Sequence, residues 1–477
     1  MNREEILAVY YLGPDAVVEL VSALLREIED LKERVNRLEQ QNAKNSRNSN
    51  NPPSADGFRK IKKSGKKKKG RKTGGQKGHE GHTLKMSESP DEVIVIPITS
   101  CKRCGHSLKN VAKNHDRRQQ FDIPPLKLSV TEYRIEKVAC PQCGKVSAGE
   151  FPKHIRKSTQ YGSRFRSLLV YLSQYQLLPY RRIREYVNDV FGHRVSEGTL
   201  YNTIKECYNN LEETEAKIKS RIIESYAAGF DESGARCEGK LHWLHTAGTD
   251  KHTFFGFHQK RGQEAMDEFG ILPNFQGYAM HDCFWPYFNY FSCSHLLCNS
   301  HLIRELTFQH EELGQKWAGD MIDLILEIKE KTDIAKERGK SSALPKRMQL
   351  DFERRFDRKV RTGLRKNPYF RQMPGRKGRS KQTDTYNLLV RLKCFKDLYL
   401  EFMYDFRVPF DNNQSERDFR MLKVHQKISG CFRSFAGAQF FCRIRGYIST
   451  ARKNGVNILD AIAASFSGNP FVPAAEG

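Results

Sequence analysis

The chain has 477 residues, enough for about three or four domains, and 38% of them are hydrophobic. It carries 81 Lys and Arg against 56 Asp and Glu, a formal net charge of +25. This composition excludes a small disulfide-stapled scaffold and a wholly disordered chain, and it predicts a polyanionic partner. Glu4 and Glu5 lie where a signal peptide would be basic and then apolar, and no run of about 18 apolar residues occurs. We therefore expect a cytoplasmic protein without a membrane partner.

Residues 1–45 are expected to form a coiled-coil dimerisation helix. Apolar side chains follow a heptad, with Val21, Ile28 and Val35 at the a positions and Leu24, Leu31 and Leu38 at the d positions. β-branched residues at a and Leu at d favour a parallel two-stranded coil, hence a homodimer. Three heptads are near the lower limit for this pattern, so an amphipathic helix packed on its own domain stays open.

The positive charge is concentrated in two segments. Residues 57–79 hold eleven Lys and Arg and no acid, and residues 345–381 hold fourteen Lys and Arg against three acids. Residues 46–92 are rich in Asn, Ser, Gly and Pro and predict a disordered basic linker. Such a segment is either only a solvated linker or a tail that neutralises phosphates and gives salt-sensitive affinity for DNA.

Residues 93–152 are expected to form a zinc ribbon. Two Cys-x-x-Cys-Gly motifs lie 35 residues apart, and two such pairs complete a closed tetrahedral site for structural Zn²⁺. The four predicted ligands are Cys101, Cys104, Cys140 and Cys143. A strand-like run over 126–138 predicts the ribbon's hairpin. Two unrelated surface pairs, or His106 or His115 in place of one cysteine, remain alternatives.

Residues 160–222 read as a helical region. Helices are expected over 167–177 and 180–190, then a turn at Gly192 and a third helix capped by Ser196. Tyr201, Asn202 and Lys205 share the outer face of that third helix, which is compatible with a helix-turn-helix reading DNA. Helices of this size also commonly just pack together.

From residue 224 the pattern indicates an α/β core. Strands are expected over 226–231, 241–248, 253–257 and 278–282, with a helix over 263–269 between the last two, and helices follow from residue 301. Asp231 and Asp282 end strand-like segments, and Glu416 lies near the start of a later helix. Three such carboxylates can hold two divalent cations for phosphodiester chemistry. Each acid alone is more simply an ordinary surface charge or a helix cap.

Several short motifs together resemble a known family. They occur in this order: Gly74-Gly-Gln-Lys-Gly-His79, the two Cys-x-x-Cys-Gly pairs, Phe230-Asp-Glu-Ser233, His281-Asp282, Cys298-Asn-Ser-His301-Leu-Ile-Arg304-Glu305, Asp411-Asn-Asn-Gln-Ser-Glu416-Arg-Asp-Phe-Arg420, Lys427, and Thr450-Ala-Arg-Lys-Asn-Gly455. Nearly the whole chain thus resembles bacterial transposases of the insertion sequence sixty-six family. One small departure is Ser233, where many relatives carry Thr.

The resemblance implies a multidomain α+β protein with a ribonuclease H-like α/β catalytic core. That core would comprise residues 223–308 and 406–477, interrupted by a basic helical insertion over 309–405 that grips DNA. Asp231, Asp282 and Glu416 would be the catalytic acids and would bind two Mg²⁺ or Mn²⁺ ions. Asp231 is preferred over Glu232, because neighbouring side chains on a strand point to opposite faces.

The implied function is a DNA transposase, which binds inverted repeats at element ends, cleaves the strand and joins it to target DNA. Double-stranded DNA would be the partner, with accessory transposition proteins possible. The alternative is a dimeric zinc-ribbon and helix-turn-helix regulator, or a decayed transposase that binds without cutting. Two further sets of residues are singled out: Cys298 and His301, as a supporting pair that braces the helix to the sheet or acts directly, and a basic helix face formed by Arg417, Arg420, Lys423 and Lys427.

Overall fold

The computed structural model describes residues 3–45, 47–49, 83–112, 114–339, 341–370 and 382–474. The predicted basic linker and the Gly-Gly-Gln motif therefore lie mainly outside the described residues, as does part of the second basic segment. The described residues of 83–132, together with 186–194, form one compact unit, and the other described residues form a second, larger one. None of the helices in these described ranges has the length and apolarity that crossing a membrane requires.

The larger unit contains most of the regular structure. Its N-terminal helices are α1 and α2, and the predicted heptad lies within α2 (Pro14–Ala43), as a single helix of 30 residues. The six a and d side chains of the heptad are exposed. The predicted helix is thus present, while pairing with a second chain stays a prediction. The helices of this N-terminal part and of the following helical region are α1 (Arg3–Tyr11), α2, α3 (Ser163–Val170), the π-helical turn η2 (Tyr171–Tyr175), α4 (Tyr180–Phe191), α5 (Glu197–Asn210) and α6 (Glu212–Ile223).

Local capping rules account for the start of α5. The Ser196 hydroxyl accepts a hydrogen bond from the Thr199 N–H at 3.0 Å, as the N-cap prediction requires. Gly192 has φ +61°, the left-handed conformation expected just after the end of α4. The first helix of this region begins at Ser163, four residues before the predicted start, and continues into η2.

A five-stranded sheet forms the centre of the larger unit, with strand order β5-β4-β3-β6-β7. Strand β4 runs antiparallel to both of its neighbours, β3 and β5, whereas β6 and β7 run parallel to β3. The fifth strand, β7, was not predicted. The elements of this region are β3 (Ala227–Cys237), β4 (Lys240–Gly248), β5 (Thr253–His258), α7 (Gln263–Phe269), the 3₁₀ turns η3 (Leu272–Asn274) and η4 (Trp285–Asn289), β6 (Tyr278–His281) and β7 (Ser294–Leu297).

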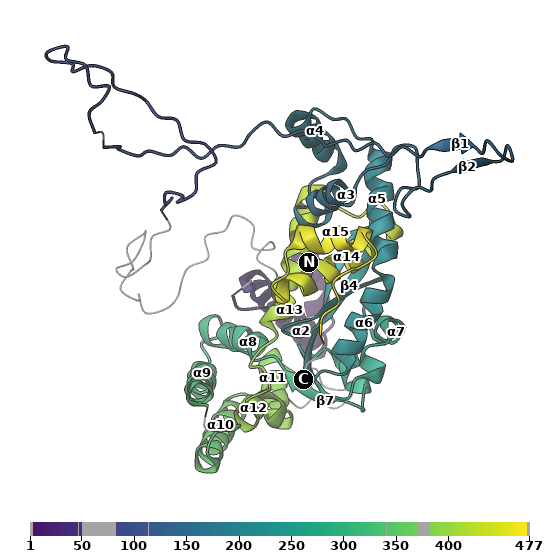
Figure 1. Ribbon diagram of the computed structural model, residues 1–477. Helices are drawn as coiled ribbons and strands as arrows, with labels where there is room; N and C mark the ends of the chain where they lie inside the picture. Colours follow the sequence, from purple (N-terminus) through teal and green to yellow (C-terminus); the bar gives the residue numbers. More distant parts are fainter. Residues whose placement is uncertain are drawn as a thin grey trace. The chain divides into compact units, whose positions relative to one another are not determined.

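Helices cover both faces of the sheet (Figure 1). Ala228 and Phe230 of β3 pack with Ile218 and Ile222 of α6 on one face. On the other face, a second core joins β3, β4 and β5 to two later helices, α13 (Asn413–Ser429) and α14 (Phe435–Lys453). A third core joins α14 to α5 and to α15 (Ile458–Phe466). Alternate residues of β3 therefore face different helical layers.

The segment between β7 and α13 is helical, as predicted. Its helices are α8 (Asn299–Glu311), α9 (Lys316–Arg338), α10 (Lys346–Lys366), α11 (Asp384–Cys394) and α12 (Lys396–Tyr404). They share a hydrophobic core with β6 and β7, in which Trp317 and Phe356 are fully buried. In Figure 1, α9, α10, α11 and α12 lie together in the lower part of the drawing. This segment is thus a packed helical bundle.

The predicted ribbon hairpin is only partly present. Of the strand-like run over 126–138, only the last residues form a strand, β1 (Lys137–Ala139), which pairs antiparallel with β2 (Val146–Ala148). The prediction of strand structure was wrong for residues 126–136. That run alternates apolar residues but finds no partner strand among the described residues, and alternation without a ladder does not make a strand.

Candidate active site and zinc finger

Asp231 and Asp282 lie on neighbouring strands of the sheet. Asp282 directly follows β6 as predicted, but β3 does not end at Asp231: it stays paired with β4 and continues to Cys237. The parallel register pairs Ala227 with Tyr278 and Gly229 with Met280, and continuing it two residues places Asp231 across from Asp282. Asp282 directly follows β6, and its Oδ1 accepts the Phe284 N–H at 3.0 Å. The intervening Cys283 has φ +73°, a left-handed conformation that is uncommon for a side chain other than Gly or Asn. The chain thus turns sharply just after the second acid.

Glu416 lies in the first turn of α13, which packs on the same face of β3 as Asp231. The Asn412 amide donates to the Phe230 carbonyl at 2.9 Å, and the Asn412 N–H donates to Cys298 Sγ at 3.2 Å. A Cβ on Gly229 would lie 2.0 Å from Asn412 Oδ1, so only glycine permits this close approach. The motif that begins at Asp411 therefore docks the start of α13 onto β3.

Burial and neighbouring acids raise the pKa of Asp231. Burial raises the pKa of Asp231 well above its usual range, and the negative charges of Glu232, Asp282 and Glu416 raise it further. Carboxylates that crowd in this way are unfavourable unless a proton or a cation compensates their charge. Nevertheless, within the ranges that the structure describes, no three His, Cys, Asp or Glu side chains are gathered tightly enough to hold a metal ion.

Arg304 of α8 supplies a positive charge at this site. Its Nη2 donates to Glu416 Oε2 at 2.6 Å. The second oxygen, Glu416 Oε1, is buried and has no hydrogen-bond partner among the described residues, although His301 Nε2 lies 3.5 Å away. A buried carboxylate oxygen without a donor is suited to a cation. The chemistry of Glu416 Oε1 therefore suits a cation, while Glu416 Oε2 is already held by Arg304.

Glu232 occupies the opposite face of β3 from Asp231. Its carboxylate accepts from the Tyr287 hydroxyl at 2.6 Å and from Arg261 Nε at 2.8 Å. Arg261 in turn lies over the Phe284 ring, with its guanidinium carbon 4.0 Å from the ring centroid. These hydrogen bonds leave Glu232 satisfied by protein groups, in agreement with the preference for Asp231.

Cys298 and His301 have different surroundings. Cys298 braces the start of α13 through the hydrogen bond from Asn412, as the bracing interpretation expects. His301 instead points to the acids: burial lowers its pKa, and the negative charges of Glu416 and Asp282 oppose that shift. Cys298 thus has a bracing contact, whereas His301 lies beside the acids. Arg304 belongs to the same sequence motif, but no role was predicted for it.

The basic residues predicted on α13 do not form one uniform face. Arg417, Arg420 and Lys427 are exposed, whereas Lys423 is half-buried and its Nζ donates to the Gly234 carbonyl at 3.1 Å. On α5, Tyr201, Asn202 and Lys205 are exposed as expected, and Tyr201 also contacts the Phe440 ring.

Both Cys-x-x-Cys-Gly motifs form knuckle turns. The Cys101 N–H donates to the His106 carbonyl and the Gly105 N–H to the Cys101 carbonyl, at 2.8 and 2.9 Å; Cys140 and Gly144 repeat this pattern. Both glycines have positive φ, 73° and 71°. The backbone N–H groups of Cys104 and Arg103 lower the pKa of Cys101, and those of Cys143 and Gln142 lower that of Cys140. Each turn thus favours the thiolate, which is the form that binds zinc.

Family models match most of the chain. Residues 158–440 match the model described as the transposase IS66 family, and residues 99–144, which contain all four knuckle cysteines, match the zinc-finger binding domain of transposase IS66. Residues 13–85 match a family of unknown function. No curated protein matches the chain.

These matches define a class of protein, the DNA-binding transposases with a zinc finger, and they support a structural zinc. Since the match over residues 158–440 alone covers more than half of the 477 residues, the chain belongs to the IS66 transposase family.

Proposed function

We propose that this transposase binds the inverted repeats at the ends of its element, cleaves a DNA strand there and joins the freed 3′-hydroxyl to target DNA. The observation that supports the proposal is the register of two parallel strands, which sets Asp231 within β3 across from Asp282 just after β6, while the start of α13, which carries Glu416, docks on β3. The strand order, with three antiparallel strands followed by two parallel ones, supports a ribonuclease H-like core.

Asp231, Asp282 and Glu416 would hold a pair of Mg²⁺ or Mn²⁺ ions. When bound, such a pair activates the attacking water or hydroxyl and stabilises the leaving oxygen of a phosphodiester. The chain's own residues would prepare the site. Arg304 compensates the charge of Glu416, and the exposed Arg417 and Arg420 on the same helix offer positive charge to the DNA backbone.

The helical insertion offers a second surface for DNA. One face of α10 packs into the core through Phe352, Phe356 and Val360. The opposite face carries an exposed arginine stripe, spaced by three, four or seven residues, formed by Arg347, Arg354, Arg358, Arg361 and Arg365. This stripe suits a phosphate backbone, and its affinity would be independent of base sequence and sensitive to salt.

The remaining modules would organise the complex. The exposed heptad of α2 would pair two chains in parallel, and the four knuckle cysteines would share one Zn²⁺. The exposed face of α5 that carries Tyr201, Asn202 and Lys205 would contact the element's ends. Accessory proteins would be additional partners.

Incubating the full chain with DNA that carries the element's own ends, with Mg²⁺ or Mn²⁺, tests the proposal. Metal-dependent nicking at the ends, followed by joining to a second duplex, is the expected result. Binding of the ends without any cleavage would instead favour the DNA-binding regulator or a decayed transposase. Scrambled end sequences serve as the control for specificity.

A further inference from the structure

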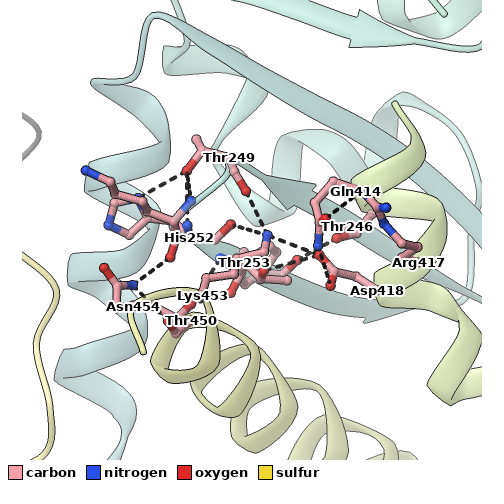
Figure 2. Close-up of polar contacts among 12 residues, drawn as sticks. Thr246, Thr249, His252, Thr253, Gln414, Arg417, Asp418, Thr450, Lys453 and Asn454 are labelled. Atoms are coloured by element: carbon pink, nitrogen blue, oxygen red, sulfur yellow. Dashed lines mark hydrogen bonds and ion pairs between the residues drawn. The ribbon is translucent and has the colours of Figure 1, made fainter. Parts of the chain in front are cut away.

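A buried polar network surrounds Lys453, in the last turn of α14 (Figure 2). The Lys453 ammonium lies 3.2 Å from Asp418 Oδ2, and the two side chains are only 10% and 12% exposed. It also donates to the carbonyls of Thr249 and His252, at 2.7 and 3.1 Å. Lys453 thus joins α13, which carries Asp418, to the turn between β4 and β5.

Other residues of the same sequence motif hold the same turn. Thr450 Oγ1 accepts the Thr253 N–H at 3.0 Å, and Asn454 Nδ2 donates to the Lys251 carbonyl at 2.9 Å. Thr253 Oγ1 donates to Asp418 Oδ2 at 3.3 Å. The segment from Thr450 to Gly455, to which the proposed function gives no task, is therefore attached at several points to β5 and to α13.

Asp418 and Glu416 lie on different flanks of α13. Residues two positions apart on an α-helix are separated by about 200° around its axis. Arg304 of α8 pairs with Glu416 on one flank, and Lys453 of α14 pairs with Asp418 on the other. The buried side chains between them, Ser415 and Phe419, face the sheet. Two ion pairs on opposite flanks fix the rotation of the helix about its axis and hence the direction of Glu416.

The network also reaches the surface. Gln414 Nε2 donates to Asp418 Oδ1 at 3.3 Å, and Arg417 Nη2 donates to Gln414 Oε1 at 3.0 Å (Figure 2). Arg417 is exposed and belongs to the face proposed to contact DNA. A phosphate that engages Arg417 would therefore act on a side chain connected to the Lys453–Asp418 pair.

We propose that Lys453 is a positioning residue for the catalytic centre, which sets the orientation of Glu416 through its ion pair with Asp418. The inference rests on the proposed function, because it requires Glu416 to take part in metal binding. The competing interpretation is that Lys453 only closes the turn between β4 and β5. The two differ in whether loss of the pair changes the metal site or merely the stability of the fold.

A titration of the full chain with Mn²⁺, without DNA, separates these interpretations. The electron paramagnetic resonance signal of free Mn²⁺ measures how much of the ion is bound. The variants are Lys453→Met, which keeps the aliphatic stem, and the nearly isosteric Asp418→Asn. Glu215→Gln is a matched control. Glu215 of α6 forms a similarly buried ion pair, at 3.0 Å, with Arg443 of α14, so this variant removes a pair of α14 that does not involve α13. The Mn²⁺ that Asp231→Asn still binds measures binding outside the proposed catalytic site.

Lys453→Met and Asp418→Asn are expected to weaken Mn²⁺ binding about 10-fold, the low end of the effect of losing a group that orients a metal ligand, because they act on Glu416 only through the helix. Glu215→Gln is expected to lower Tm without changing the Mn²⁺ affinity. Unchanged affinity in a folded Lys453→Met or Asp418→Asn would overturn the inference; if Lys453→Met does not fold, Asp418→Asn decides. If the wild type binds no more Mn²⁺ than Asp231→Asn, the proposed metal site itself fails, and this inference fails with it.

Discussion

Replacing Gly229 by alanine should displace the helix that carries Glu416. The new Cβ would lie 2.0 Å from Asn412 Oδ1 and 2.8 Å from Ser415 Oγ. Ordinary contacts between non-bonded heavy atoms begin at about 3.5 Å, so Asn412 Oδ1 must move about 1.5 Å away from the new Cβ. That movement would break its hydrogen bonds to Phe230 and Cys298 and shift the start of α13.

The expected losses follow from this displacement. Overpacking of this kind lowers the free energy of unfolding by about 1–3 kcal/mol. A misplacement of about 1 Å at a reacting centre lowers the rate about 100-fold, so end cleavage by Gly229→Ala should fall at least that far. Urea unfolding followed by circular dichroism measures the first quantity, and single-turnover cleavage of labelled end DNA measures the second.

Gly234→Ala on the same strand is the matched control. Its Cβ would lie 3.2 Å from the end of the Leu241 side chain, which can turn away, and 4.0 Å from the Trp243 ring, an ordinary contact. We expect this variant to keep its cleavage rate within a few-fold of wild type, about the scatter of surface changes. If Gly229→Ala cleaved as fast as Gly234→Ala, the docking of α13 on β3 would not position Glu416, and the reasoning above would be refuted.

Three further predictions concern separate modules. Cys101→Ser should lower bound zinc from about one equivalent per chain to a small fraction, measured by atomic absorption; undiminished zinc would contradict a site that uses this knuckle. Leu31→Lys should convert a dimeric full chain to monomers in analytical ultracentrifugation, and a persistent dimer would exclude pairing through the heptad. Burial lowers the pKa of His245 to about 4, so between pH 7 and pH 5 the unfolded chain gains a proton that the folded chain does not. Folding stability should therefore fall by about 2 kcal/mol from this group as the pH falls, and His245→Gln should flatten the pH dependence of urea unfolding; an unchanged slope would count against it.

Local signals in the sequence predicted much of the fold. The helix over 263–269, the cap at Ser196 and the turn at Gly192 depend on neighbouring residues, and the structure has all three. The strand β7 was missed because its four residues, Ser294–Leu297, include only two apolar side chains, next to each other, and so show no alternation. The strand predicted over 126–136 is absent although apolar residues alternate there, because alternation cannot reveal whether a partner strand exists.

The acids of the candidate site could be named from the sequence, but their partners could not. The local signal of a strand end held for Asp282, which directly follows β6, but not for Asp231, beyond which β3 continues to Cys237. The contact between Arg304 and Glu416 joins residues 112 positions apart, and that between Lys453 and Asp418 depends on how α14 crosses α13. Such long-range pairs are set by packing, so only the structure shows which cation compensates which acid.

The neighbouring acids Asp231 and Glu232 allow the most direct test of the central claim. Asp231 faces α13 and the other acids, whereas Glu232 lies on the opposite face and is held by Tyr287 and Arg261. End cleavage by the full chain with Mn²⁺ should be abolished in Asp231→Asn, which still binds the ends, and retained in Glu232→Gln. Cleavage by Asp231→Asn at the wild-type rate would contradict the account.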